Sequence, residues 1–124
     1  MNRILITLGA AVCVISSAAS AGQGLQQNIN FMARMPDAKL NLAATMAGNV
    51  IGAMQRCRAL RPTEDGKAII AVPSLLWDGV DKHLTPNPPK FKRAIRAYEA
   101  AYYKAVRRRD DCQTEKAKYP WLYR

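Results

Sequence analysis

The residues best suited to bind another molecule lie close together near the C-terminus. Residues 93–112 read RAIRAYEAAYYKAVRRRDDC, in which cationic side chains and tyrosines recur at helical spacing. On a helical wheel one face collects the cations with a single tyrosine among them: Lys92, Arg93, Arg96, Tyr103, Lys104 and Arg107. Such a face attracts anionic groups. The pattern predicts a partner- or anion-binding surface, with an ordinary solvated helix face as the alternative.

The tail KYPWLYR, residues 118–124, is a second candidate. Its aromatic and aliphatic side chains favour folding back over the open side of a helical bundle. The alternative is an exposed aromatic hook for a partner protein, because such side chains are enriched at binding hot spots. On that alternative, Trp121 and Tyr123 join the candidate partner-binding residues.

Cys57 and Cys112 are expected to form a disulfide, since an even pair in a small exported domain is typical of one. The bond would close a loop of about 55 residues and, on loop-closure entropy, add about 4 kcal/mol to the free energy of unfolding. Zinc binding and redox catalysis are disfavoured because His83 is the sole histidine and no CxxC spacing occurs. We expect no metal and no cofactor.

A hydrolase can be composed from Ser74 and His83, with Asp78 and Asp81 nearby. No G-x-S-x-G motif surrounds the serine. Ser74 is better interpreted as a helix N-cap after Pro73, and His83 as an exposed residue at a helix end. We therefore keep the hydrolase as a minor alternative.

Acid catalysis would require a glutamate withdrawn from water. Glu64 stands beside Asp65 in an expected turn, Glu99 lies on a charged helix flank, and Glu115 falls in a fraying helix end. None of the three is expected to be desolvated, and no catalytic residue is assigned.

Helical periodicity accounts for most of the chain that must position these residues. We predict helices at about 25–35, 38–60, 74–84 and 90–117. The first is amphipathic and ends at Pro36, and Trp77 is expected on the inner side of the third. Residues 61–73 are left as helical or extended, with Thr63 a candidate cap for a helical turn that Gly66 interrupts.

Small residues mark one side of the second expected helix. Gly48 and Gly52 repeat at a spacing of four, which allows another backbone to approach closely. A membrane interpretation is disfavoured because polar side chains interrupt the uncharged run: Asn41, Thr45, Asn49 and Gln55.

Two further expectations concern the last helix. Tyr98 and Tyr102 fall on its apolar, core-facing stripe, which leaves Tyr103 as the tyrosine placed for a partner. Asp110 and Asp111 are expected to pair with Arg107 and Arg108 within one turn.

The N-terminus has the three parts of a secretory signal peptide. Arg3 precedes the apolar run 4–15, and Ala19 and Ala21 stand at the positions of an A-x-A cleavage site. Cleavage would remove residues 1–21, including Cys13. A retained N-terminal anchor is the alternative, but the apolar run is shorter than the about 20 residues that span a bilayer. We predict a periplasmic or secreted protein, for which chromosomal nucleic acid is a disfavoured partner.

Residues 22–124 are enough for one small domain. They hold 18 basic and 9 acidic side chains, a net charge of +9, and residues 90–124 alone hold 11 basic and 4 acidic ones. This asymmetry indicates an anionic neighbour for the C-terminal third.

Together these features predict an all-α domain, a bundle of three or four helices with one disulfide. Its predicted function is non-catalytic binding in the cell envelope, as an accessory, inhibitor or immunity-type protein. The partner would be an envelope or secreted protein, or an anionic polymer or lipid. The alternatives are binding to membrane or lipopolysaccharide through the face at 92–107, and the small hydrolase. The sequence does not define an oligomeric state.

Overall fold

The computed structural model describes residues 22–124, and the expected signal peptide lies outside them. The described chain forms six helices: α2 (Gly22–Arg34), α3 (Asp37–Arg56), α4 (Glu64–Ile70), α5 (Val72–Asp81), α6 (Pro88–Val106) and α7 (Cys112–Lys118). Apart from one isolated bridge between Pro62 and Tyr123, the described residues contain no strand pairing. The predicted all-α class is confirmed. The four predicted helices correspond to α2, α3, α5 and α6, and two seven-residue helices, α4 and α7, add to them.

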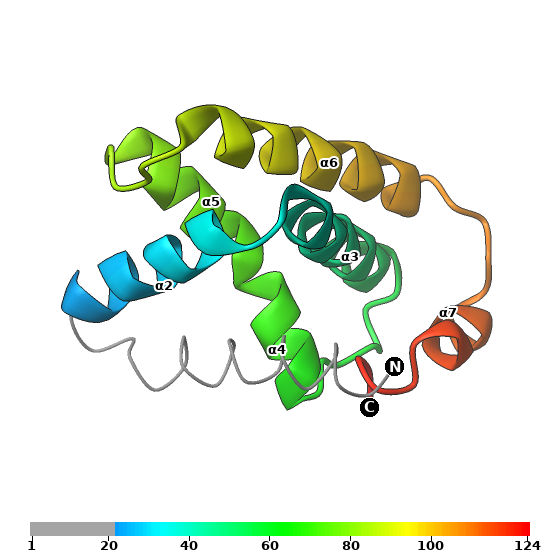
Figure 1. The fold of residues 1–124 in the computed structure, drawn as a ribbon. Coiled ribbons are helices and arrows are strands. Elements are labelled where there is room, and N and C mark those ends of the chain that lie inside the picture. The colour runs from blue at the N-terminus through cyan, green and yellow to red at the C-terminus, as the bar shows by residue number, and fades with distance from the viewer. Residues whose placement is uncertain (1–21) are drawn as a thin grey trace.

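The centre of the fold is the contact between α3 and α6, and α6 lies along α3 (Figure 1). A Cβ atom added at Gly48 would lie 2.4 Å from the carbonyl oxygen of Tyr98 and 2.8 Å from the amide nitrogen of Tyr102. At Gly52 it would lie 2.6 Å from the Cβ of Ala105. The small-residue side of α3 is therefore the side on which α6 packs, as the glycine spacing predicted.

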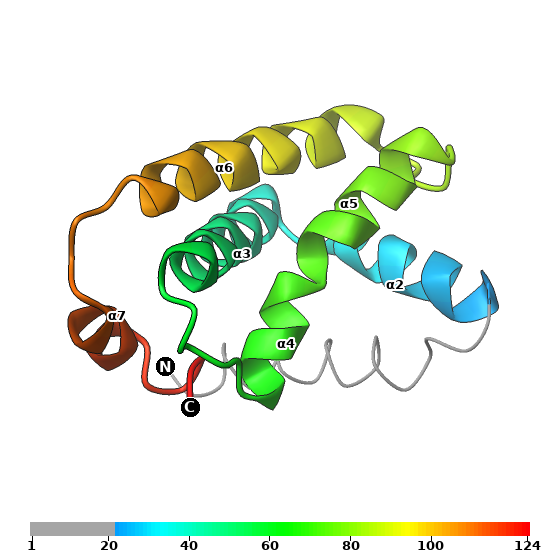
Figure 2. The same ribbon diagram turned by 180° about the vertical axis from the view of Figure 1, so that it is seen from behind.

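Helices α4 and α5 form a nearly continuous rod that runs diagonally past α3 and α2 (Figure 2). Thr63 caps the rod, since its Oγ1 accepts a hydrogen bond from Gly66 N at 3.1 Å. The cap was predicted, but Gly66 lies within α4 and does not interrupt it. The predicted start at 74 was wrong because Pro73 occupies the first turn of α5, where its missing N–H costs nothing. Ser74 consequently lies inside the helix and is not its N-cap.

The end of α5 is closed by the backbone. His83 has a left-handed φ of 55°, and the amides of Leu84 and Thr85 both donate to the carbonyl of Gly79. His83 is exposed at a helix end, as predicted. The helix itself stops at Asp81, three residues before the predicted end.

The predicted single helix 90–117 is two helices. α6 ends at Val106, and α7 begins at Cys112 after a non-helical link. Asp111 ends the link as an N-cap, its Oδ1 accepting from Thr114 N at 2.7 Å. A side chain that caps the next helix competes with continuation of the previous one, which is why periodicity alone overran the break.

The core gathers the apolar faces of α2, α3, α5 and α6 together with the tail. Its largest fully buried apolar side chains are Ile29, Leu40, Leu76, Phe91 and Leu122. Trp77, which was expected to face inward, is 41% exposed, so this expectation was wrong. The smaller inward residues Leu75 and Leu76 fill that side of α5 instead.

Candidate functional site

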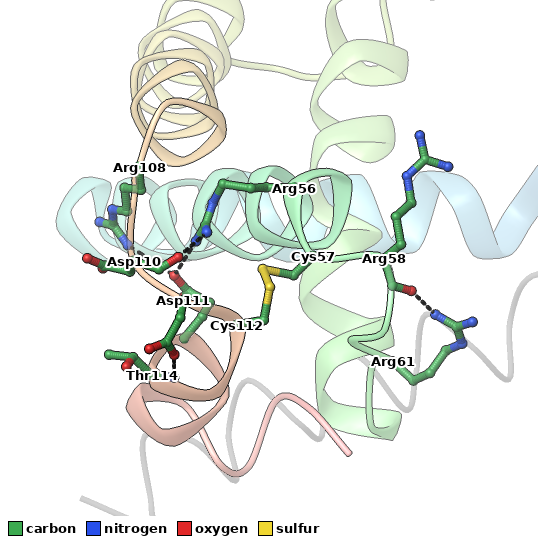
Figure 3. The surroundings of a disulfide bond; sticks show 10 residues. Arg56, Cys57, Arg58, Arg61, Arg108, Asp110, Asp111, Cys112 and Thr114 are labelled. Carbon is green, nitrogen blue, oxygen red and sulfur yellow. Dashed lines mark hydrogen bonds and ion pairs between the residues drawn. A yellow bond between two sulfur atoms is a disulfide. The ribbon is translucent and has the colours of Figure 1, made fainter.

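The predicted disulfide joins the end of α3 to the beginning of α7. Cys57 and Cys112 are bonded, with their Cα atoms 5.7 Å apart (Figure 3). The bond ties the two ends of a 55-residue separation that includes α4, α5 and α6. It thereby fixes the C-terminal segment against the centre of the bundle.

A buried carboxylate lies beside the disulfide. Glu115 has no exposed surface, and its Oε1 is 3.3 Å from Arg56 Nη2 and 3.7 Å from Arg108 Nη1. Arg56 also donates to the backbone carbonyl of Asp110 (Figure 3). The sequence interpretation of Glu115 as a solvated residue in a fraying end was wrong. The missed signal is its spacing: three residues after Cys112 on a helix, it shares the inward side that the disulfide fixes.

The expected pairing of the adjacent aspartates is also corrected. Asp110 pairs with Lys118 Nζ at 2.6 Å, and this lysine lowers the pKa of the Asp110 carboxyl. Asp111 is the α7 cap, and the hydrogen bond from the Thr114 amide lowers its pKa. Arg108 turns to the buried Glu115.

The aromatic tail folds back, as its composition favoured. Leu122 is fully buried, and its carbonyl accepts from Thr63 N at 2.9 Å, while Arg124 N donates to Arg61 O at 2.8 Å. A Cβ atom at Gly66 would lie 2.4 Å from the Leu122 carbonyl oxygen, so α4 and the tail are in backbone contact. The tail thus covers the side of the core that α4 borders.

Tyr123 is 2% exposed and is therefore removed from the candidate partner-binding residues. Burial, reinforced by the nearby charge of Glu115, raises the pKa of its phenol above the ordinary value. Among the described residues the Tyr123 hydroxyl has no hydrogen-bond partner. Trp121 remains partly exposed, with its carbonyl accepting from Thr63 Oγ1 at 2.6 Å.

The start of α6 is anchored to the turn between α2 and α3. Lys90 is buried, and its Nζ donates to the carbonyls of Ala33, at 2.8 Å, and Met35 at the end of α2. Arg93 Nη2 lies 2.8 Å from Asp37 Oδ2, and this bond lowers the pKa of Asp37. Arg93 belongs to the predicted basic face, but it is partly engaged within the molecule.

The remaining predicted cations stay available. Lys92, Arg96, Lys104 and Arg107 are exposed. Within residues 22–124 none of these four makes an ion pair. Tyr103 stands among them with 56% of its surface exposed. We call these five residues, Lys92, Arg96, Tyr103, Lys104 and Arg107, the basic face of α6.

The other two tyrosines lie at the edge of the core, half-buried, where a core-facing position was predicted. The rings of Tyr98 and Tyr102 are 6.0 Å apart, and those of Tyr102 and Tyr103 meet edge-on at 5.3 Å. Tyr102 OH donates to Gln55 Oε1 of α3 at 2.7 Å. The tyrosines therefore link the basic face to the surface of α3.

A shallow depression of about 450 Å³ adjoins this link. It is lined by residues from the last turns of α3 and just beyond: Ile51, Met54, Gln55 and Arg58. The sequence interpretation missed it, because a partly exposed residue on an apolar stripe has the same pattern as a buried one.

Ser74 and His83 are not brought together. Ser74 lies in the first turn of α5, whereas His83 lies beyond its last turn, nine positions along the chain. In the described part of the chain no cluster of three or more His, Cys, Asp or Glu side chains is placed to hold a metal ion. Among the described helices, none has the length and apolar character required to cross a bilayer.

No protein-family model matches the chain, and comparison with the curated proteins and with the solved structures gives no match either.

Proposed function

We propose that the protein is an exported, non-catalytic binding protein of the cell envelope, of the accessory, inhibitor or immunity type, that engages an anionic partner through the basic face of α6. One observation carries the proposal: three exposed cations on α6 and a fourth at its C-cap, all without ion pairs in the described chain, flank an exposed tyrosine. Buried Lys90 anchors the start of that helix, and the disulfide anchors the segment that follows it. A face presented on an anchored helix loses little conformational freedom on binding, which favours affinity.

The proposed destination rests on two features. The N-terminal pattern of charge, apolar run and small residues is typical of a signal peptide. A disulfide between the two remaining cysteines suits an oxidising compartment, periplasmic or extracellular. Partners would then be envelope or secreted proteins, or anionic polymers and lipids.

Binding to a membrane or to lipopolysaccharide is the second candidate, and the same basic face supports it. The apolar side of α6 packs against α3, as the glycine contacts require. The helix would therefore meet a bilayer through its charges alone, without the apolar insertion of an interfacial helix. The hydrolase alternative gains no support from the separated Ser74 and His83.

Charge reversal tests the proposal. The oxidised chain of residues 22–124 is immobilised over native envelope extract and washed at low and then high salt. The test variant changes Lys92, Arg96, Lys104 and Arg107 to glutamate, which lowers the net charge from +9 to +1. The control variant makes the same change at exposed Lys39, Lys67, Lys82 and Arg124, for an equal net charge.

We expect the test variant to lose the bound partner and the control variant to keep it. A contact made by ions alone weakens steeply as salt rises. A protein retained through high salt supports a specific interface, whereas lipid or polymer that washes away supports the second candidate. Equal losses in both variants would contradict a role for this face.

A further inference from the structure

The depression on α3 lies where the buried side of this helix emerges from the core. Ala47 is fully buried, and Ile51 and Met54, about one turn and two turns further along the same side, are only partly covered. Together with Gln55 and Arg58 they line about 450 Å³ of open space. Two apolar side chains are thus presented at the surface in a concave setting, which is typical of an anchor site for another molecule.

Of the two polar side chains that line the depression, Gln55 is held in position and Arg58 is cationic. Gln55 is held by the hydroxyl of Tyr102 at 2.7 Å. Arg58 is exposed, and its side chain points away from the disulfide and from Arg56 (Figure 3). Among the residues that line the depression there is no carboxylate, and among the described residues Arg58 makes no ion pair.

The tyrosines make this depression continuous with the basic face. Tyr102, bonded to Gln55, meets Tyr103 edge-on at 5.3 Å, and Tyr103 lies on the basic face itself. Tyrosine, arginine and methionine are the residue types enriched in the centres of protein interfaces. The combined surface has an apolar centre, an aromatic border and a cationic rim.

We infer that the depression receives an apolar side chain from an acidic segment of a partner protein, with the flanking carboxylates of that segment on Arg58 and the basic face. Charge complementarity selects the acidic segment. A polyanion without apolar groups has nothing to bury against the apolar lining of the depression. A lipid chain would be poorly enclosed, because the depression is open. The inference rests on the proposed function and names the chemical class of its partner.

Two synthetic peptides test the inference on the oxidised chain. One carries a single leucine flanked on each side by three glutamates, and the other has alanine in place of leucine. Binding is followed by calorimetry and by the methyl NMR signals of Ile51 and Met54. We expect the leucine peptide to bind at least tenfold more tightly, the equivalent of about 1.4 kcal/mol, and to shift both methyl signals.

Substitutions in the depression test whether it causes the tighter binding of the leucine peptide. Met54→Glu is expected to abolish the advantage of leucine over alanine, whereas Leu42→Glu, at an exposed leucine on the same helix, leaves it unchanged. Arg58→Glu is expected to weaken both peptides at least fivefold, and Lys39→Glu less than twofold. Circular dichroism confirms that each variant is folded.

The outcomes separate this inference from the proposed function. Equal binding of the two peptides, with shifts confined to α6, would overturn the anchor site and leave an anion-binding face. Binding to phosphatidylglycerol vesicles with no binding to either peptide would overturn it in favour of a lipid surface. Failure of both peptides to bind, with a protein still captured from envelope extract through the basic face, would overturn the anchor site and leave the proposed function standing.

Discussion

Two contacts of α3 with the rest of the molecule, one along its length and one at its C-terminal end, depend on different physical interactions. Along its length, α3 meets α6 through glycine and alanine, and the specificity of the contact comes from the absence of side-chain atoms at Gly48 and Gly52. At its C-terminal end, α3 is fixed to α7 by a covalent bond and by the ion pairs of buried Glu115 with Arg56 and Arg108. The first contact depends on shape, whereas the second depends on a few strong individual interactions.

This difference matters for the surface that we propose binds a partner. The basic face lies on α6, which the shape-dependent contact holds, while Arg58 and the depression lie where α3 ends, next to the disulfide. A change in either contact should therefore move one half of the proposed interface relative to the other.

Removal of the disulfide is expected to have the largest effect. The double variant Cys57→Ser, Cys112→Ser should lower the free energy of unfolding by about 4 kcal/mol, because the unfolded chain regains the freedom of a long loop. Denaturant titration measures the loss. Hydrogen exchange should also quicken at the amides of Thr63 and Arg124, which form the backbone hydrogen bonds between residues 61–63 and the tail. Unchanged protection there would show that the buried ions alone hold the C-terminal segment.

A methyl group added to the shape-dependent contact should lower the free energy of unfolding by about half as much. Gly48→Ala places a carbon 2.4 Å from the Tyr98 carbonyl, and a backbone atom cannot rotate away. Although alanine favours the helix by about 1 kcal/mol, we expect a net loss of about 2 kcal/mol as α6 is pushed from α3. Leu42→Ala, at an exposed position of the same helix, should stay within about 0.5 kcal/mol. An unchanged free energy of unfolding for Gly48→Ala would contradict close packing of α3 against α6 at this position.

The sequence predicted the shape-dependent contact and the disulfide, but it missed the buried carboxylate and its arginines, for a physical reason. Helical periodicity and a glycine repeat are local patterns, so Gly48 and Gly52 indicated the packing side of α3 before any partner was known. The pairing of Cys57 with Cys112 was predicted because they are the two cysteines of residues 22–124. Glu115 is different, since its burial depends on where the disulfide places α7 and on two arginines, one of them 59 residues away in the chain. No local pattern contains that information.

The candidate site divides in the same way. A cationic side of the last helix was predicted because charged and apolar residues separate on a helical wheel, and four of the five predicted cations are exposed without an ion pair in the described structure. Arg93 pairs with Asp37 and Tyr123 is buried in the core, so the structure does not leave either one free as a binding residue. Both outcomes depend on contacts between segments that are distant in the sequence. The depression on α3 arises where coverage by neighbouring helices stops, which a helical wheel does not show.

Loss of the buried carboxylate is expected to have a smaller effect than loss of the disulfide. Glu115→Gln removes the charge that compensates Arg56 and Arg108, whose side chains are 17% and 25% exposed. Because both arginines retain some contact with water, we expect a loss of about 2 kcal/mol, below the range for a fully buried pair. Chemical denaturation measures it, and Glu64→Gln, at an exposed residue of α4, is the matched control. An unchanged free energy of unfolding would show that the disulfide alone holds α7 against α3.

Tyr123 gives the smallest change at neutral pH and a distinct signature at high pH. Burial raises the pKa of its phenol, so the neutral form is the one that the fold favours. The stabilisation linked to this shift is complete below the ordinary tyrosine value of about 10 and is lost as the pH rises through the higher folded value. Tyr123→Phe removes a buried hydroxyl that has no partner in the described chain and should change stability by less than about 1 kcal/mol at pH 7. Between pH 10 and 12 the variant should lose less stability than the parent, whereas parallel curves would mean that Tyr123 ionises in contact with water and that the tail is less firmly packed than the core.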